Sequence, residues 1–180
     1  MEKEELLARA KEEKVSFVQM QFMDILGIVK NVTIPVTKLE DALERGVVFD
    51  GSSIVGYATI DESDMRLQPL VDTYLTLPWT SGDMKTARLI CEIHQPDGTR
   101  FIGDPRYILE KILLRARKLG YNYCVGPEFE FFLFKLDEKG EPTTNTEGYG
   151  GYFDLMPMDE GELVRKEAVN YANIMGFEAE

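Results

Sequence analysis

Apolar and polar residues alternate along much of residues 15–34, and a period of two is typical of a half-buried β-strand. The alternation breaks at Asp24 and resumes at Ile28. Two alternating runs joined by a short segment that ends in glycine predict a β-hairpin over 15–34. The apolar positions in the first half of this hairpin are Val18, Met20 and Phe22.

Helices are predicted on both sides of this hairpin. Residues 3–14 form a short charged segment with helical character. Thr37 and Glu40 have the spacing of a capping box, and Gly46 is suited to end the helix that they open. The stretch 47–66 is dense in Gly, Ser and Asp, and we expect a loop of about 20 residues, a length that is more often functional than incidental.

Strand-like runs return at 70–77 and 86–93, so the N-terminal part is predicted to be a mixed β domain with one clear helix. The pattern changes at Asp104, which precedes a proline and a helical spacing of apolar residues. We therefore expect two domains, 1–103 and 104–180, in a protein of the α+β class.

The second domain is predicted to open with a helix that ends at Gly120, followed by a strand pair over 121–136. Asp159 and Glu162 then start another capped helix, which runs to Gly176. The residues after this helix look like the start of a further strand. We therefore expect this domain to be the truncated beginning of a larger one.

The composition is that of a folded protein, with 44% hydrophobic and 11% aromatic residues. A formal charge of −12, from 20 Lys and Arg against 32 Asp and Glu, argues against a surface for nucleic acid or anionic membrane. Cys91 and Cys124 lack metal-ligand spacing, and His94 is expected at the surface. Because no long apolar run or signal-peptide core is present, we expect a cytoplasmic protein.

Glu128 and Glu130 carry the clearest candidate chemistry. Their phenylalanine-rich run, 126–134, is predicted to be a buried strand, so both carboxylates should share one face, about 6 to 7 Å apart at Cα. Carboxylates held side by side repel each other, and Mg²⁺ or Mn²⁺, which prefer oxygen ligands, would relieve this repulsion. On spacing alone, a half-exposed strand with a solvated acidic face is the simpler interpretation.

Several motifs point further when they are taken together. They are Phe-Asp-Gly-Ser-Ser-Ile at 49–54 with Asp-Glu-Ser-Asp-Met at 61–65, Gly-Pro-Glu-Phe-Glu-Phe-Phe at 126–132, and Gly-Gly-Tyr-Phe-Asp at 150–154, with supporting segments at 21–27, 78–79 and 103–106. In this order and at these distances, they closely resemble the first part of bacterial type I glutamine synthetase. The resemblance runs along essentially the whole chain but covers only the first part of the usual family length.

The resemblance implies a β-grasp-like N-terminal domain and the incomplete start of an antiparallel-sheet catalytic domain. It implies a ligase that joins ammonia to the γ-carboxylate of glutamate at the expense of ATP, through γ-glutamyl phosphate, with Mg²⁺ or Mn²⁺ as cofactor. Glu128 and Glu130 match the family's Glu-x-Glu metal ligands, and phosphoryl transfer needs cations to offset charge on the phosphate oxygens. Phe129 stands where many relatives have proline, and we expect little effect.

The resemblance also implies an ammonium site. Asp50 matches the aspartate that binds ammonium and helps to take its proton, which a carboxylate can do as a general base. Ser53 and Asp64 match residues that shape or support the same loop, and Tyr152 matches a tyrosine that lines the ammonium pocket. Without the resemblance, residues 50–53 would be interpreted as an ordinary Asx turn and Tyr152 as a core aromatic.

In the family, the loop that carries Asp50 reaches the active site of a neighbouring subunit in a ring of two stacked hexamers, so Asp50 and Glu128 of one chain would serve different sites. We expect a full-length protein to bind glutamate, ammonium and ATP, and the 180-residue chain alone to be inactive. Two alternatives remain open. The chain could be a stand-alone binding or assembly module, or a relative that ligates a polyamine to glutamate, although the intact loop from Asp50 to Ser53 favours ammonia.

Overall fold

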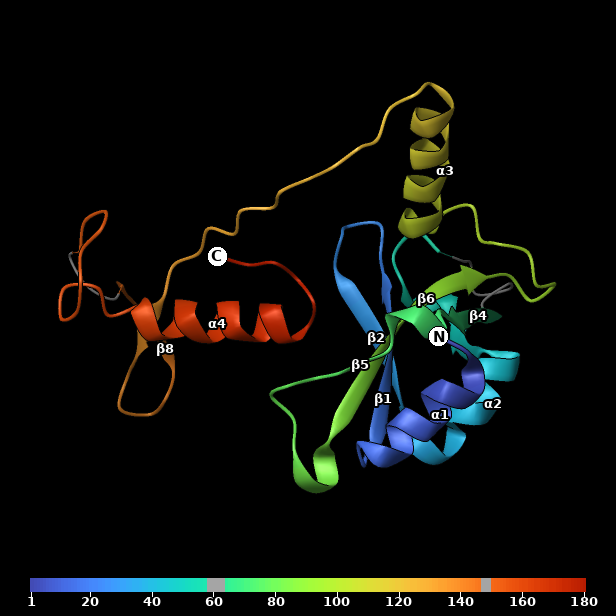
Figure 1. Cartoon of the computed structure of the whole chain (residues 1–180), viewed down its shortest axis with the longest axis horizontal. Coiled ribbons are helices and arrows are strands. Elements are labelled where there is room, and N and C mark those ends of the chain that lie inside the picture. Colours follow the sequence, from blue (N-terminus) through green and yellow to red (C-terminus); the bar gives the residue numbers. More distant parts are fainter. Residues whose placement is uncertain (58–63, 147–149) are drawn as a thin grey trace. The chain divides into compact units, whose positions relative to one another are not determined.

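The computed structural model describes residues 1–57, 64–146 and 150–180 (Figure 1). These residues form two compact units, Met1–Tyr123 and Cys124–Glu180, and each unit contains its own β-sheet. The motif residues 61–63 and the glycine-rich residues 147–149 lie outside the described parts, so the predictions that fall on them stay predictions.

A mixed sheet forms the first unit, in the order β2-β1-β6-β4-β3, with β5 also paired to β6. β1 runs parallel to β6, and the other named pairs are antiparallel. The β1–β2 pair places Val18 opposite Ile34 and Met20 opposite Val32, which confirms the hairpin predicted over 15–34. The strands are β1 (Phe17–Met23), β2 (Val29–Pro35), β3 (Val47–Asp50), β4 (Asp64–Pro69), β5 (Leu75–Thr76) and β6 (Thr86–His94).

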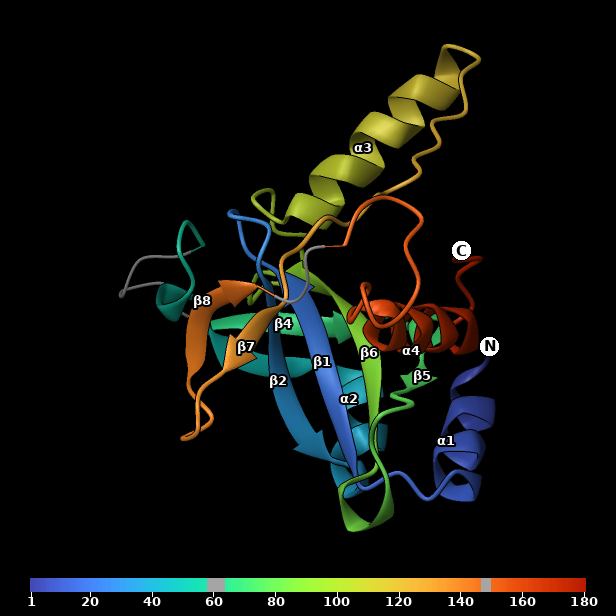
Figure 2. The ribbon, with the colours of Figure 1, turned by 90° about the vertical axis from the view of Figure 1, so that its left-hand side faces the viewer.

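Two helices, α1 (Lys3–Glu12) and α2 (Leu39–Arg45), cover one face of this sheet (Figures 1 and 2). Alternate residues of β1, β4 and β6 point toward them, as the strand period requires. Burial of each large apolar side chain in this layer contributes roughly 1.5–3 kcal/mol. The α+β class predicted from the sequence is confirmed. The apolar residues with 0% exposure are Leu6, Val18, Met20, Leu39, Leu67, Ala87, Leu89 and Ile93.

Asp104 joins the sheet to the helix α3 (Pro105–Lys118), which projects away from the sheet (Figure 2). Its carboxylate is 1% exposed and accepts hydrogen bonds from the N–H groups of Arg106 at 2.9 Å and Ile93 at 3.3 Å. The helix ends before Gly120, whose φ is +86°. Both predicted ends of this helix are confirmed, because each depends on residues next to it in the sequence.

The second unit contains the antiparallel pair β7 (Phe134–Leu136) and β8 (Pro142–Thr146), followed by α4 (Glu162–Ile174). The strand pair predicted over 121–136 is wrong except for β7. Residues 121–133 form an irregular extended segment that has no ladder partner among the described residues (Figure 1). Without a partner, the backbone N–H and C=O groups need water, so the segment stays exposed.

The loop predicted over 47–66 is shorter than expected. Its two ends pair with each other as β3, which begins at Val47, and β4, which begins at Asp64. The strand predicted over 70–77 is reduced to the two residues of β5, because a 3-10 turn at Val71–Thr73 precedes it. In both cases the residue types indicate the right region of the chain, but the bounds of each strand are set by its pairing with a neighbouring strand.

Two predicted helix caps also differ from the structure. Thr37 lies inside the 3-10 turn Val36–Lys38, which runs directly into α2, so it does not occupy the cap position. At α4, Gly161 takes the cap position, and the Asp159 carboxylate accepts a hydrogen bond from Arg165 at 3.1 Å. None of the helices in the described ranges is long and apolar enough to cross a membrane.

Replacing Gly46 by alanine should destabilise the first unit by about 2–4 kcal/mol. Gly46 has a φ of +72°, and an added Cβ would lie 2.6 Å from Arg66 Cγ and 2.7 Å from the Leu67 carbonyl oxygen. Gly27→Ala is the matched control, because its φ is +80° but no described atom lies within 4 Å of its Cβ position. The control should cost only about 1 kcal/mol. Urea unfolding of the three proteins measures the difference, and equal losses would contradict the close approach.

Candidate functional site

Asp50 is the last residue of β3, and its carboxylate organises the turn that follows. Oδ1 accepts hydrogen bonds from the Ser52 N–H at 2.9 Å and from the Ser52 hydroxyl at 2.6 Å, and Oδ2 accepts one from the Ser53 hydroxyl at 3.4 Å. Asp50 thereby caps the 3-10 turn Gly51–Ser53. These hydrogen bonds fix the conformation of the Asp50 side chain. Because the side chain is also exposed, its oxygens stay accessible to a ligand.

Asp64 lies directly opposite Asp50 in the antiparallel β3–β4 ladder. Side chains at opposite positions point to the same face, with Cβ atoms about 4.5–5.5 Å apart. Like charges at such positions repel each other, and a cation between them would relieve the repulsion. Sequence analysis predicts Asp64 only as a supporting residue. Its closeness to Asp50 depends on the register of β3 against β4, which a strand assignment for residues 47–50 alone would not have given.

The bonds to Asp50 lower the pKa of its carboxyl below the ordinary value, chiefly through the Ser52 hydroxyl and then through the Ser52 N–H. The group is therefore ionised throughout the neutral pH range. An ionised carboxylate favours the binding of a cation. The same bonds make it a weaker base than a carboxylate that accepts no hydrogen bonds.

The hydrogen-bonded turn alone does not set Asp50 apart from other aspartates of the chain. Asp97 makes the same bonds to Thr99, with the N–H at 2.9 Å and the hydroxyl at 2.7 Å, and its pKa is likewise lowered, chiefly by the Thr99 N–H. The Asx-turn interpretation of residues 50–53 is thus correct as local structure. What Asp50 has in addition is the carboxylate of Asp64 across the ladder.

Glu128 and Glu130 belong to the second unit, where both are exposed. Phe129 between them is 84% exposed, so the predicted burial of the aromatic face is wrong. Two carboxylates supply the oxygen donors that Mg²⁺ and Mn²⁺ prefer, and the residues fit such an ion as part of a larger ligand set. No group of three or more His, Cys, Asp or Glu side chains suited to a metal is found within the described ranges. The metal assignment remains a prediction.

The two other ring side chains singled out from the sequence lie in different units. Tyr152 is 90% exposed and meets Phe153 edge-on, with 4.4 Å between the ring centroids, so the core-aromatic interpretation is wrong. His94 is partly buried in the first unit, with Nδ1 2.9 Å from the Gly98 carbonyl oxygen and Nε2 3.1 Å from the Glu92 carboxylate. Its predicted surface position is only partly correct.

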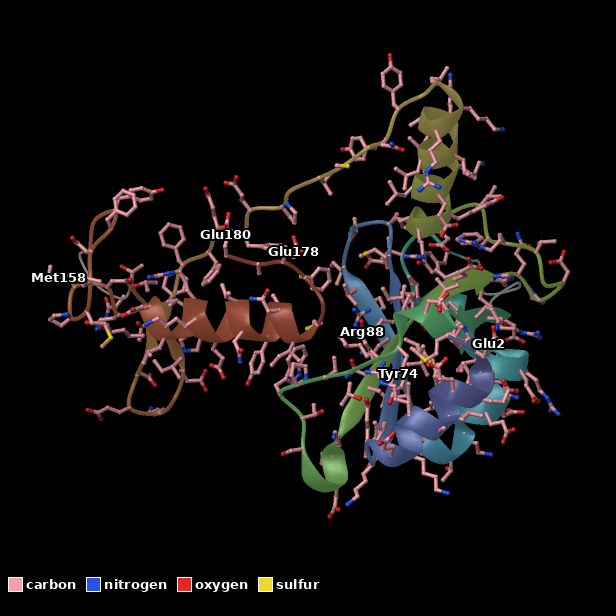
Figure 3. All side chains as sticks on the ribbon, viewed as in Figure 1. Glu2, Tyr74, Arg88, Met158, Glu178 and Glu180 are labelled. Carbon is pink, nitrogen blue, oxygen red and sulfur yellow. The ribbon has the colours of Figure 1, made fainter. Side chains whose placement is uncertain are left out.

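A pocket of about 330 Å³ lies at the start of α4 in the second unit. Arg165 contributes a guanidinium to its wall, but the Asp159 carboxylate bonds to that group, so its charge is already balanced. Glu128 and Glu130 are not among the lining residues. The wall also contains Phe131, Phe132, Leu133, Thr146, Gly150, Gly151, Met158 (labelled in Figure 3), Glu160 and Gly161.

Two family descriptions match consecutive parts of the chain. "Glutamine synthetase, beta-Grasp domain" matches residues 14–96, and "Glutamine synthetase, catalytic domain" matches residues 102–180. Proteins described as glutamine synthetase from Staphylococcus aureus strain Mu50 and from Staphylococcus epidermidis are 51% and 50% identical over 179 residues. These alignments cover 99% of this chain and 40% of either relative, so the chain spans about two fifths of their length.

Solved structures show the same fold at much lower sequence identity. One described as "GmaS/ADP complex-Conformation 1" aligns with a TM-score of 0.71 at 20% identity, covering 95% of this chain and 39% of that one. Glutamine synthetase from Plasmodium falciparum aligns with a TM-score of 0.70 at 19% identity, covering 98% and 40%.

The two matched domains follow each other in one class of protein, with a β-grasp domain first and a catalytic domain second. The chain belongs to the glutamine synthetase family and corresponds to the N-terminal part of its members. The resemblance seen in the sequence and the expected β-grasp domain are confirmed. The boundary between domains at 103/104 stays a prediction.

Ser52→Ala should raise the pKa of the Asp50 carboxyl toward its ordinary value, because the Ser52 hydroxyl is the largest cause of the lowering. Ser53→Ala is the matched control and should raise the pKa less, since its hydroxyl lies 3.4 Å away. NMR titration of the Asp50 side-chain carbon measures both.

The sign of the effect on stability follows from the same shift. A carboxyl whose pKa is lowered in the folded state stabilises the fold above its unfolded pKa, and this contribution is lost as the pH falls through the folded pKa. The stability difference between wild type and Ser52→Ala should therefore shrink in acid. An unchanged Asp50 pKa in Ser52→Ala would contradict the hydrogen-bond assignment.

Proposed function

We propose that the full-length protein containing this chain is an ATP-dependent glutamate–ammonia ligase that forms glutamine through γ-glutamyl phosphate. The observation that carries the proposal is the exposed, ionised Asp50 at the end of β3, with Asp64 opposite it, in a chain of the glutamine synthetase family. Two carboxylates on one face attract a small cation such as ammonium. Ser52 and Ser53 hold the Asp50 oxygens in place for that cation.

Asp50 concentrates and orients ammonium in this proposal. Because its pKa is lowered, it is better suited to hold the ammonium ion than to keep the proton that ammonium loses before attack. Ser53 and Asp64 support the same loop. Tyr152 is exposed and is proposed to line the ammonium pocket in the assembled protein.

Glu128 and Glu130 are proposed to hold Mg²⁺ or Mn²⁺ together with ligands from elsewhere in the full-length protein. When bound, the metal offsets negative charge on the phosphate oxygens of ATP. Two exposed carboxylates alone bind such an ion weakly, because affinity rises with the number and rigidity of ligands. The 180-residue chain alone is therefore expected to be inactive.

A ring of subunits and a cytoplasmic location are further parts of this proposal. The ring is supported by the family resemblance of the loop motif at 49–54, and the location by the membership of the chain in the glutamine synthetase family. In such a ring, Asp50 of one subunit and Glu128 of its neighbour would serve the same active site.

Glu128→Ala in the full-length protein should lower ATP-dependent glutamine formation by about 100-fold or more while the oligomer is kept, because a metal ligand is lost. Glu138→Ala is the matched control, since it removes the same charge from an exposed position of the same unit. Turnover with saturating Mg²⁺ and ammonium is the measurement. Equal activity of the two variants would remove the metal assignment, and an inactive wild type would remove the proposed function.

Asp50→Ala in the full-length protein should raise the KM for ammonium by on the order of 10-fold, with the KM for ATP nearly unchanged, because a charged hydrogen-bond acceptor is lost. Asp97→Ala is a close control, since this residue makes the same turn bonds in the same unit. Steady-state kinetics with each substrate varied in turn separates the two constants. Normal saturation by ammonium in Asp50→Ala would contradict the ammonium role.

A further inference from the structure

The turn that follows Asp50 is closed at its base by aromatic side chains. Phe49 comes immediately before Asp50, and Tyr57 lies seven positions after it. The two rings lie 6.5 Å apart between centroids, and both contact Phe22 of β1, at 5.0 Å from Phe49 and 6.3 Å from Tyr57. Tyr57 also lies 5.3 Å from Phe101. We call Phe22, Phe49, Tyr57 and Phe101 the aromatic cluster.

A directional bond adds to this packing. The hydroxyl of Tyr57 donates to the carbonyl oxygen of Met23, the last residue of β1. Tyr57 is 6% exposed, and burial together with the negative charges of Asp104 and Asp24 raises the pKa of its hydroxyl far above the usual value. The hydroxyl therefore stays protonated, and remains a donor, well above neutral pH.

The tip of the β1–β2 hairpin contacts the same end of the loop. Gly56 has a φ of +81°, and a Cβ at this position would lie 2.6 Å from Ile25 Cδ1. Only glycine fits this backbone and this gap without displacing the hairpin tip. Gly56 and Tyr57 are thus held by contacts with the hairpin turn and with β1. Asp50 is held by its place in β3 and by hydrogen bonds from the two serines that follow it.

We propose that Tyr57 is a positioning residue for Asp50. It fastens the far end of the 50–57 segment to β1, so the Ser52 and Ser53 donors stay in register with the Asp50 carboxylate. Its removal would let the turn open and lower the apparent affinity for ammonium without touching the ATP or metal groups. This role rests on the proposed function, because it acts through the ammonium-binding role of Asp50.

The test is Tyr57→Phe in the full-length protein, with Tyr74→Phe as the matched control. Tyr74 (labelled in Figure 3) is also buried, at 4% exposure, and its hydroxyl donates to Glu13 at 3.1 Å, beside α1. Both variants keep the ring and lose one buried hydroxyl bond. The loss of one such bond corresponds to a change of about 3- to 10-fold in an equilibrium constant.

Tyr57→Phe should raise the KM for ammonium by about 3- to 10-fold, leave the KM values for ATP and glutamate within about twofold, and speed amide hydrogen exchange in residues 50–57. Tyr74→Phe should lose comparable stability without either effect. A purely structural role for Tyr57 predicts the same kinetics for both variants, and that result would overturn the proposal. So would faster exchange in 50–57 with an unchanged KM for ammonium.

An inactive wild type would instead overturn the proposed function. Hydrogen exchange would still test whether Tyr57 anchors the 50–57 segment to β1. Exchange in 50–57 that speeds up only in Tyr57→Phe supports the anchor. Equal exchange in both variants contradicts it.

Discussion

The parallel pairing of β1 with β6 is the interaction on which the rest of the first unit depends. It places Phe17 beside Thr86 and Gln21 beside Ile90, and parallel strands of this kind require a long crossover between them. That crossover contains β2, α2, β3, β4 and β5. β6 then pairs with β4, β4 pairs with β3, and the end of β3 fixes Asp50, so the candidate site is positioned by a chain of strand pairings that begins at the centre of the sheet.

Two buried carboxylates organise the region where these strands end. Asp24 is 2% exposed and accepts hydrogen bonds from the N–H groups of Leu26 and Ile28, both at 2.9 Å, with Lys30 at 3.4 Å. Asp104 is held similarly at the start of α3. Buried charges are tolerated only when donors and cations surround them, as here. The hairpin tip and the start of α3 are thus each fixed by one buried carboxylate. The negative charges of Asp24 and Asp104 both raise the pKa of the Tyr57 hydroxyl.

The local parts of the fold follow from sequence patterns, and the paired parts do not. The alternation over 15–34 and the capping signal of Asp104 act within a few residues, and both predictions are confirmed. A strand forms only with a partner, so residues 121–133 have the composition of a strand yet stay unpaired within the described ranges. For the same reason Asp50 can be singled out from its motif, whereas the closeness of Asp64 depends on the β3–β4 register, which no local pattern encodes.

Glu128 and Glu130 have a consequence that does not involve catalysis. They are interleaved with phenylalanines, of which Phe129 is 84% and Phe132 is 78% exposed, and exposed aromatic strand-prone segments tend to stack with their own copies. Charges within such a segment act as gatekeepers, because stacking would bring like charges together. The carboxylates proposed to attract a metal are therefore also placed to oppose self-assembly of this segment. A cation that neutralises these charges before the remaining ligands are in place would remove that protection.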